Sequence, residues 1–271
     1  MPEAPRDLAA VEARMASITA VQQVMSAVWA LARAQQPRVE AAAAEATAYL
    51  DVAEQIVERL AGSPKVDLTD DDDVLWVLVG PERAFCGPLA RMLLEQLPAS
   101  GALGLVGHRL REVAAQEPDL LERVVFTVDA ASTPDELGLR ADALATAILA
   151  AGRTTVMLLH PDQGGPELHR SVLLAAARAT AAEPPETFLP PDEVLEAAVL
   201  EAVAGRLAVA LVEALRAEVR ARLVAAEAAR SSCDRRLGEL TQTWRALRQG
   251  SITQELIELT SGRRAPKGPV T

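Results

Sequence analysis

Several residue types on which catalytic and binding sites depend are scarce in this sequence of 271 residues. Lysine occurs only at Lys65 and Lys267, and neither lies in the glycine-rich context of a phosphate-binding loop, which excludes nucleotide hydrolysis of that kind. Cysteine occurs only at Cys86 and Cys233, too few for a disulfide framework, so we expect a reducing compartment.

Metal ligands are scarce in the same way. The three histidines, His108, His160 and His169, are too scattered along the chain to predict a metal site. The acidic run at residues 70–73 is expected to be a solvated loop that ends a linker, rather than a cation site.

A surplus of positive charge is also missing. The 27 Lys and Arg residues face 38 Asp and Glu residues, and the net charge of −11 disfavours a nucleic-acid partner. Aromatic residues make up only 3% of the chain, whereas half of it is apolar. The apolar content is therefore mostly Ala, Leu and Val, which suits close packing of helices.

Long apolar runs and targeting signals are not expected either. Arg153 interrupts the best apolar stretch, at residues 143–159, before it reaches the length of about 18 residues that a membrane span needs. Residues 1–14 carry three acidic side chains and no basic region followed by an apolar stretch, which is not typical of a signal peptide.

The N-terminal region, residues 1–62, contains no glycine before Gly62 and is predicted to be a long helix. Its apolar residues recur at spacings of three and four, which forms the seam of an amphipathic helix: Leu8, Val11, Met15, Ile18. Pro37 disfavours a straight helix, so we expect either one bent helix or two helices joined near Gln36.

The middle region, residues 74–182, alternates short β-prone runs with helix-like stretches, which is typical of an α/β sheet. The expected strands are 74–79, 102–106, 123–128 and 154–159, and the expected helices are 88–97, 109–116 and 134–151. Residues 171–177 fit either an edge strand or a helix, and we favour the strand. A proline-containing stretch at 183–191 then marks a boundary.

The C-terminal region, residues 192–262, has no proline and reads as one helix with a continuing apolar seam, which includes Leu237, Leu240, Trp244 and Leu247. About 70 residues would span roughly 105 Å, far beyond a compact domain with a radius of gyration near 13 Å. The N-terminal helix is the one long amphipathic partner, so the two are predicted to form an antiparallel coiled coil. Residues 263–271 are predicted to be a disordered tail.

The turn after the first strand reads Gly-Pro-Glu-Arg-Ala-Phe-Cys-Gly at 80–87. Its spacing is not that of a dinucleotide-binding loop, and Glu82 would repel a pyrophosphate, so no cofactor is expected. No histidine lies near Cys86 in the sequence, which favours a small residue packed under the turn over a nucleophile. No constellation of residues predicts an active site.

Three segments, in the same order, resemble the gamma subunit of F-type ATP synthases. Residues 248–256, RQGSITQEL, resemble the C-terminal signature of that family, residues 14–27 resemble its N-terminal helix, and 82–89, ERAFCGPL, resemble its Asp-Arg-Gly-Leu-Cys-Gly-Gly-Leu turn. The chain departs from the family where Ala84 and Pro88 replace glycines and where Trp244 replaces a tyrosine. The turn is similar to that of the divergent alternative ATP synthase of some bacteria.

The resemblance implies long helices that form an antiparallel coiled coil on a central Rossmann-like α/β domain. It implies a central rotor shaft that couples ion-driven rotation to ATP synthesis or hydrolysis at the beta subunits, while this chain itself is not catalytic and holds no cofactor. The implied partners are the alpha and beta subunits, the epsilon subunit and the ring of c subunits, on the cytoplasmic face of the bacterial inner membrane, which the chain reaches only through the complex. The residues implied to contact the beta subunits are Arg248, Gln249, Thr253 and Glu255.

Two alternatives stay open at this point. A cytoplasmic coiled-coil scaffold with an α/β head would form a stable homodimer alone. An α/β enzyme would need a deep polar pocket in the sheet domain, and the missing cluster of ionisable groups argues against it.

Overall fold

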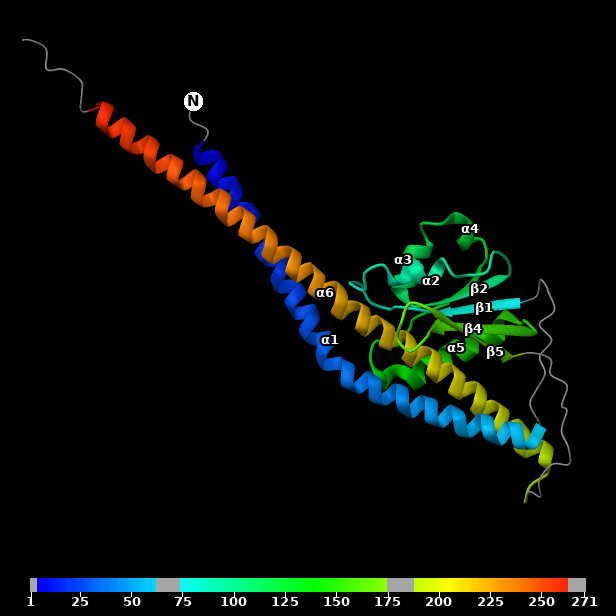
Figure 1. Cartoon of the computed structure of the whole chain (residues 1–271). Helices are drawn as coiled ribbons and strands as arrows, with labels where there is room; N and C mark the ends of the chain where they lie inside the picture. The colour runs from blue at the N-terminus through cyan, green and yellow to red at the C-terminus, as the bar shows by residue number, and fades with distance from the viewer. Residues whose placement is uncertain (1–3, 62–73, 175–187, 263–271) are drawn as a thin grey trace, which may run out of the picture. The chain divides into compact units, whose positions relative to one another are not determined.

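A computed structural model describes residues 4–61, 74–174 and 188–262 of the chain (Figure 1). The residue contacts divide the chain into two compact units, one made of residues up to 29 and from 226 onward, the other of residues 30–225. Both long helices contribute to both units, so the units cut across the domain boundaries that the sequence suggests. Each unit is described by itself.

The larger unit contains a five-stranded sheet in the order β3-β2-β1-β4-β5. The strands β1, β2, β3 and β4 are parallel, and β5 is antiparallel to β4 at one edge. The strands are β1 (Val74–Val79), β2 (Ala102–Val106), β3 (Val124–Val128), β4 (Thr155–Pro161) and β5 (Leu168–Leu174). Strands buried on both faces read as continuous apolar runs, which explains the composition of β1, β2 and β4.

Short helices connect the parallel strands and cover the sheet (Figure 1). They are α2 (Leu89–Leu94), α3 (His108–Ala114), α4 (Pro118–Leu121), the 3₁₀ turn η1 (Pro134–Glu136) and α5 (Leu137–Ala151). On one face of the sheet, Leu75 and Val77 pack with Leu144 of α5. On the other face, Leu78 packs with Leu93 and with helix α3.

The long helices α1 (Ala4–Ala61) and α6 (Pro191–Gly262) pack against each other within the larger unit. Ala32 and Val39 of α1 are buried with Leu215 and Val219 of α6. A Cβ on Gly205 would lie only 3.2 Å from the Leu50 side chain, so the small residue permits a close approach of the two helices.

Polar contacts fix the relative direction of the two helices in this unit. Arg222 donates to Gln35, Arg216 pairs with Glu40 at 2.6 Å, and Arg206 pairs with Glu54 at 2.8 Å. The residue numbers on α6 fall as those on α1 rise, so the helices run antiparallel. Burial raises the pKa of Glu40, but Arg216 and Arg220 outweigh it and hold this pKa below its usual value.

The smaller unit repeats the antiparallel arrangement. Trp244 donates from Nε1 to Glu12 at 2.8 Å, and Arg230 lies over the ring of Trp29, with 5.4 Å between Cζ and the ring centroid. The predicted fold class, with long terminal helices paired antiparallel and a central α/β domain, is confirmed.

The structure refines several expected boundaries. Residues 74–79 and 102–106 form strands with the bounds that the sequence suggests, whereas β5 begins earlier than expected, at Leu168. The four-residue helix α4 was not predicted. Pro37 lies inside the single helix α1. Residues 70–73, 175–177 and 263–271 lie outside the described part of the chain, so the expectations for a solvated acidic loop, for the end of the edge strand and for a disordered tail are not addressed there.

Helix α1 is more apolar over part of its length than expected. Helix α1 contains an 18-residue window with a mean hydropathy of 1.3, which by length and composition alone could cross a membrane. The expectation counted only uninterrupted apolar runs, whereas this helix reaches the value with alanine and valine between polar residues. Only 11% of the window is buried within the chain, so much of this apolar surface is exposed.

Candidate functional site

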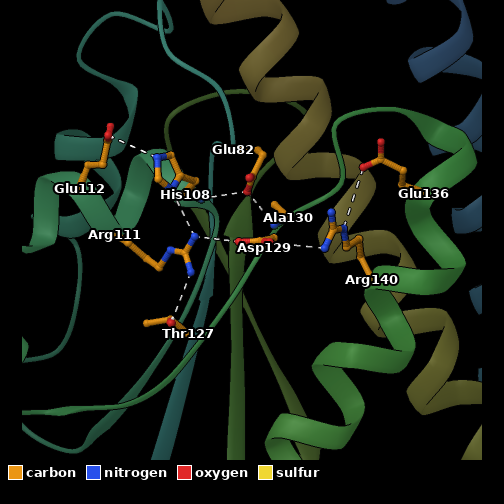
Figure 2. Close-up of polar contacts among 9 residues, drawn as sticks. All are labelled: Glu82, His108, Arg111, Glu112, Thr127, Asp129, Ala130, Glu136 and Arg140. Atoms are coloured by element: carbon orange, nitrogen blue, oxygen red, sulfur yellow. Dashed lines mark hydrogen bonds and ion pairs between the residues drawn. The ribbon is translucent and has the colours of Figure 1, made fainter.

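The carboxyl ends of β1, β2 and β3 meet at one edge of the sheet, where open α/β sheets commonly bind ligands. Here Glu82, in the turn after β1, points into this edge (Figure 2). Its Oε2 accepts hydrogen bonds from the backbone N–H of His108 at 2.9 Å and of Ala130 at 2.8 Å. These donors follow β2 and β3, so one carboxylate joins the ends of three strands.

A tight backbone crossing holds Glu82 in place. Gly107 adopts a φ of 119°, and a Cβ at this position would lie 2.6 Å from the carbonyl oxygen of Pro81. Only glycine combines this backbone conformation with so close an approach. The backbone N–H groups of His108 and Ala130, which follow β2 and β3, are therefore occupied by the protein's own carboxylate.

A network of charged side chains lies beside Glu82 (Figure 2). Arg111 donates to Asp129 at 2.7 Å and to the Thr127 hydroxyl at 3.4 Å. Its 3.2 Å contact with His108 Nδ1 requires that nitrogen to be the acceptor. His108 Nε2 then faces Glu112 at 3.3 Å. Asp129 also lies 3.6 Å from Arg140. Asp129 and Glu112 each face a basic side chain, so the network orders this edge of the sheet.

Cys86 is buried at the end of the same turn, with 2% exposure. Burial and the nearby Glu218 carboxylate raise the pKa of its thiol. A raised pKa disfavours the nucleophilic thiolate, which supports the interpretation of Cys86 as a packing residue.

The structure brings two of the scattered histidines together, which the sequence analysis missed. His160 and His169 are paired across β4 and β5, with 5.0 Å between ring centroids. They line a cavity of about 290 Å³ that Thr47 and Arg206 also border. Within the described ranges, no three His, Cys, Asp or Glu side chains gather as metal ligands. The antiparallel register of β4 and β5 places His160 opposite His169. This register is set by the turn at residues 162–167, so only a prediction of that turn could have paired the two histidines from the sequence.

His160 is almost fully buried, and this burial lowers its pKa to about 4. Its Nδ1 lies 2.9 Å from the carbonyl oxygen of Pro161, which can only accept, so Nδ1 carries the proton of a neutral ring. His160 is thus a neutral structural side chain at neutral pH.

The residues suggested for partner contact lie near the C-terminal end of α6 and are exposed: Arg248, Gln249, Thr253, Glu255. Thr253 donates back to the carbonyl oxygen of Gln249 at 2.9 Å, and Ser251 lies 3.5 Å from the Glu255 carboxylate. Arg248 Cζ lies 5.0 Å from the centroid of the Trp244 ring. These contacts leave the charged and amide groups accessible from outside the helix.

The residues of the suggested seam are partly buried, and they belong to the smaller unit: Leu8, Val11, Met15, Ile18, Leu237, Leu240, Trp244, Leu247. Their burial fits the seam, and their individual contributions stay a prediction. Trp244 combines this packing with its hydrogen bond to Glu12.

Comparison with known proteins identifies the family. The model of a family described as ATP synthase matches residues 7–265. An ATP synthase gamma chain of Granulibacter bethesdensis is 25% identical over 95% of this chain and 99% of its own length. Another gamma chain, from Caldanaerobacter subterraneus subsp. tengcongensis, is 42% identical over 72 residues, which are 27% of this chain and 24% of that one.

The fold agrees with this assignment. A chain from the OSCP/F1/c-ring structure of the Euglena gracilis mitochondrial ATP synthase superposes with a TM-score of 0.68 at 13% identity, covering 98% of this chain and 99% of that one. A chain from the rotor structure of the same enzyme gives 0.66 at 12% identity over 92% and 99%. The chain therefore belongs to the ATP synthase family and, within it, to the gamma subunits.

Proposed function

We propose that the chain is the central rotor shaft of an F-type ATP synthase, which couples ion-driven rotation to ATP synthesis or hydrolysis at the beta subunits. The family match over residues 7–265 carries this proposal. The antiparallel pairing of α1 with α6 supports it, because a shaft that transmits torque needs two helices that brace each other. In this proposal residues 1–62 and 192–262 form the shaft, and residues 74–182 form the α/β domain at its base.

The chain acts without chemistry of its own. Glu82 occupies the sheet edge where a nucleotide phosphate would bind, and catalysis belongs to the beta subunits. An asymmetric shaft contacts the three beta subunits differently, and each difference in contact free energy favours a different conformation of the subunit.

The partners are the alpha and beta subunits of the head, the epsilon subunit and the ring of c subunits. This subunit belongs to the peripheral part of the complex, which lies on the cytoplasmic face of the bacterial inner membrane. The apolar window of α1 then faces protein partners, and the chain meets the membrane only through the complex. The alternative bacterial type of ATP synthase stays a prediction from the turn at 81–87.

The exposed end of α6 is the proposed contact with the beta subunits. Arg248, Gln249, Thr253 and Glu255 supply hydrogen-bonding groups, and Arg248 donates charge-assisted bonds to a beta-subunit carboxylate. Ile252, Leu256 and Leu259 on the same segment are about half exposed or more, which suits rotation against an apolar sleeve.

Co-expression with the alpha and beta subunits of the same organism tests the proposal. We expect a stable complex whose ATP hydrolysis drives ion transport in membranes with the c ring, while the isolated chain shows no ATP turnover. A chain that forms a stable homodimer alone and no complex with alpha and beta would support the scaffold alternative instead. ATP turnover by the purified chain would contradict the non-catalytic role.

A further inference from the structure

A carboxylate of the long C-terminal helix reaches into the turn that follows β1. Glu218 of α6 is only 1% exposed, and its Oε2 accepts hydrogen bonds from the backbone N–H of Glu82 at 2.7 Å and of Arg83 at 3.1 Å. Two donors on consecutive residues converge on one oxygen. The contact therefore fixes the position and the orientation of the turn relative to α6.

The other carboxylate oxygen faces a second buried charge. Arg222, one helical turn further on, lies 3.3 Å from Glu218 Oε1 and is 5% exposed. The same guanidinium nitrogen of Arg222 donates to Gln35 of α1 at 2.9 Å. Glu218 and Arg222 thus connect three segments of the larger unit: the turn, α6 and α1.

The turn itself has a backbone that its own sequence does not favour. Phe85 adopts a φ of 65°, a left-handed conformation that is unusual for a bulky residue, and its side chain is 53% exposed. Because about half of the Phe85 side chain is exposed, its burial contributes little to stabilising this backbone conformation. Such a conformation persists only where surrounding contacts impose it, and Glu218 supplies two of them.

The contact continues through the turn to the sheet. The residue whose N–H donates to Glu218 is Glu82, whose own carboxylate binds the N–H groups of His108 and Ala130. A path of one ion pair and several hydrogen bonds therefore runs from α1 and α6 through the turn to the ends of β2 and β3. These bonds are directional, so they hold the turn at one position along α6.

We propose that Glu218 is a positioning residue that locks the turn at 80–88 to α6, so that turn, sheet edge and helix move as one body when the shaft rotates. This inference rests on the proposed rotor function. A helix that could slip past the turn would dissipate part of its rotation before the α/β domain followed. Glu218 acts on coupling, and not on catalysis at the beta subunits.

The test compares two buried carboxylates of α6 in the assembled complex. Glu218→Gln removes the charge that binds the turn and Arg222. Glu213→Gln is the matched control, because Glu213 is similarly buried and bonds to Arg216 on its own helix. We expect Glu218→Gln to retain ATP hydrolysis while the ions transported per ATP fall by about half or more, and Glu213→Gln to keep the wild-type ratio. Equal ratios for wild type and Glu218→Gln would overturn the proposal.

A second measurement does not depend on the partners. In the free chain, hydrogen exchange of the amides at Glu82 and Arg83 should quicken about tenfold or more in Glu218→Gln and stay unchanged in Glu213→Gln. Unchanged exchange at these amides, or an equal increase throughout the chain, would refute a local lock. If Glu218→Gln does not fold, Glu218→Asp replaces it, because the shorter side chain keeps the charge but withdraws from the turn. Wild-type coupling in that variant, together with unchanged exchange, would again refute the proposal.

The two proposals fail in different ways. A chain that does not assemble with alpha and beta subunits contradicts the rotor function. Hydrogen exchange at Glu82 and Arg83 is measured on the free chain, so it still tests the contact with Glu218 in that case. A chain that assembles and couples normally in both variants supports the rotor function and overturns the role of Glu218.

Discussion

The guanidinium of Arg248 lies over the indole ring of Trp244, one helical turn earlier, with 5.0 Å between Cζ and the ring centroid. The ring in turn donates from Nε1 to Glu12 of α1. The indole favours one position of the guanidinium on the helix, so the proposed contact residue is oriented before any partner arrives.

Arg248→Ala should weaken the free chain only slightly and the assembled complex more strongly. Loss of an exposed cation–π contact costs about 0.5–1 kcal/mol of unfolding free energy, whereas loss of a charge-assisted bond in one rotational state should lower ATP-driven ion transport. Denaturant unfolding and transport in the reconstituted complex measure the two effects. The control is Arg245→Ala, another exposed arginine of the same helix. Wild-type transport by Arg248→Ala, or a fall of the same size in both variants, would remove Arg248 from the contact.

The hydrogen bond between Trp244 and Glu12 should contribute to the pairing of α1 with α6. Trp244→Phe keeps an aromatic ring but removes the donor, and Glu12→Ala removes the acceptor. In a double-mutant cycle on unfolding of the free chain, we expect a coupling energy of about 1 kcal/mol, because Glu12 accepts as a charged group. A coupling energy near zero would mean that the bond adds nothing to the pairing and that Trp244 contributes only by packing.

The free energy of unfolding of the chain should decrease as the pH is lowered, because His160 is buried in its neutral form. Its pKa is about 4 in the folded chain, against 6.5 for the unperturbed group, so below pH 6.5 the unfolded chain binds a proton that the folded chain does not. The contribution is complete above pH 6.5 and is lost as pH falls towards 4, by a total of about 3 kcal/mol. Urea unfolding at a series of pH values checks this. His160→Gln should flatten the pH dependence in this window, and an unchanged slope in that variant would assign the effect to other groups.

Gly250 and Gly238 provide a matched pair on α6. Neither has an atom within 4 Å of where a Cβ would lie, so alanine at either position should stabilise the free chain by about 1 kcal/mol through helix propensity. Gly250 lies inside the proposed contact segment, where a small residue admits the backbone of a beta subunit. We therefore expect Gly250→Ala alone to reduce coupled transport. Equal transport by the two variants would show that Gly250 has no role in partner approach.

Local patterns in the sequence were enough to predict much of the fold. The continuous apolar runs at 74–79 and 102–106 are strands because both faces of a parallel sheet are buried, and composition alone reveals this. Helix α4 has only four residues, too few to establish a periodicity, and was missed. The direction of the long helices followed from their amphipathic seams and from the lack of any other partner.

Contacts between distant residues could not be predicted in the same way. Glu218 and Arg222 have the spacing of four that fits an ion pair on one side of a helix, but Glu213, Arg216 and Arg220 are charged neighbours in the same stretch of α6, so the spacing reveals neither the burial of the pair nor its partners. Those partners, Glu82 and Gln35, lie more than 130 residues away, and only the tertiary fold brings them together. Likewise, Glu82 was expected to repel a phosphate, whereas the structure shows that it occupies the donors itself.

Because Glu82 belongs to the same chain as the N–H groups that it binds, their acceptor is always present. Because the carboxylate is part of the chain, its effective concentration at the sheet edge is fixed by covalent geometry and does not change with the supply of free anions. With Glu82 in place, the N–H groups of His108 and Ala130 keep the same acceptor whether the concentrations of nucleotide and inorganic phosphate around an ATP synthase are high or low.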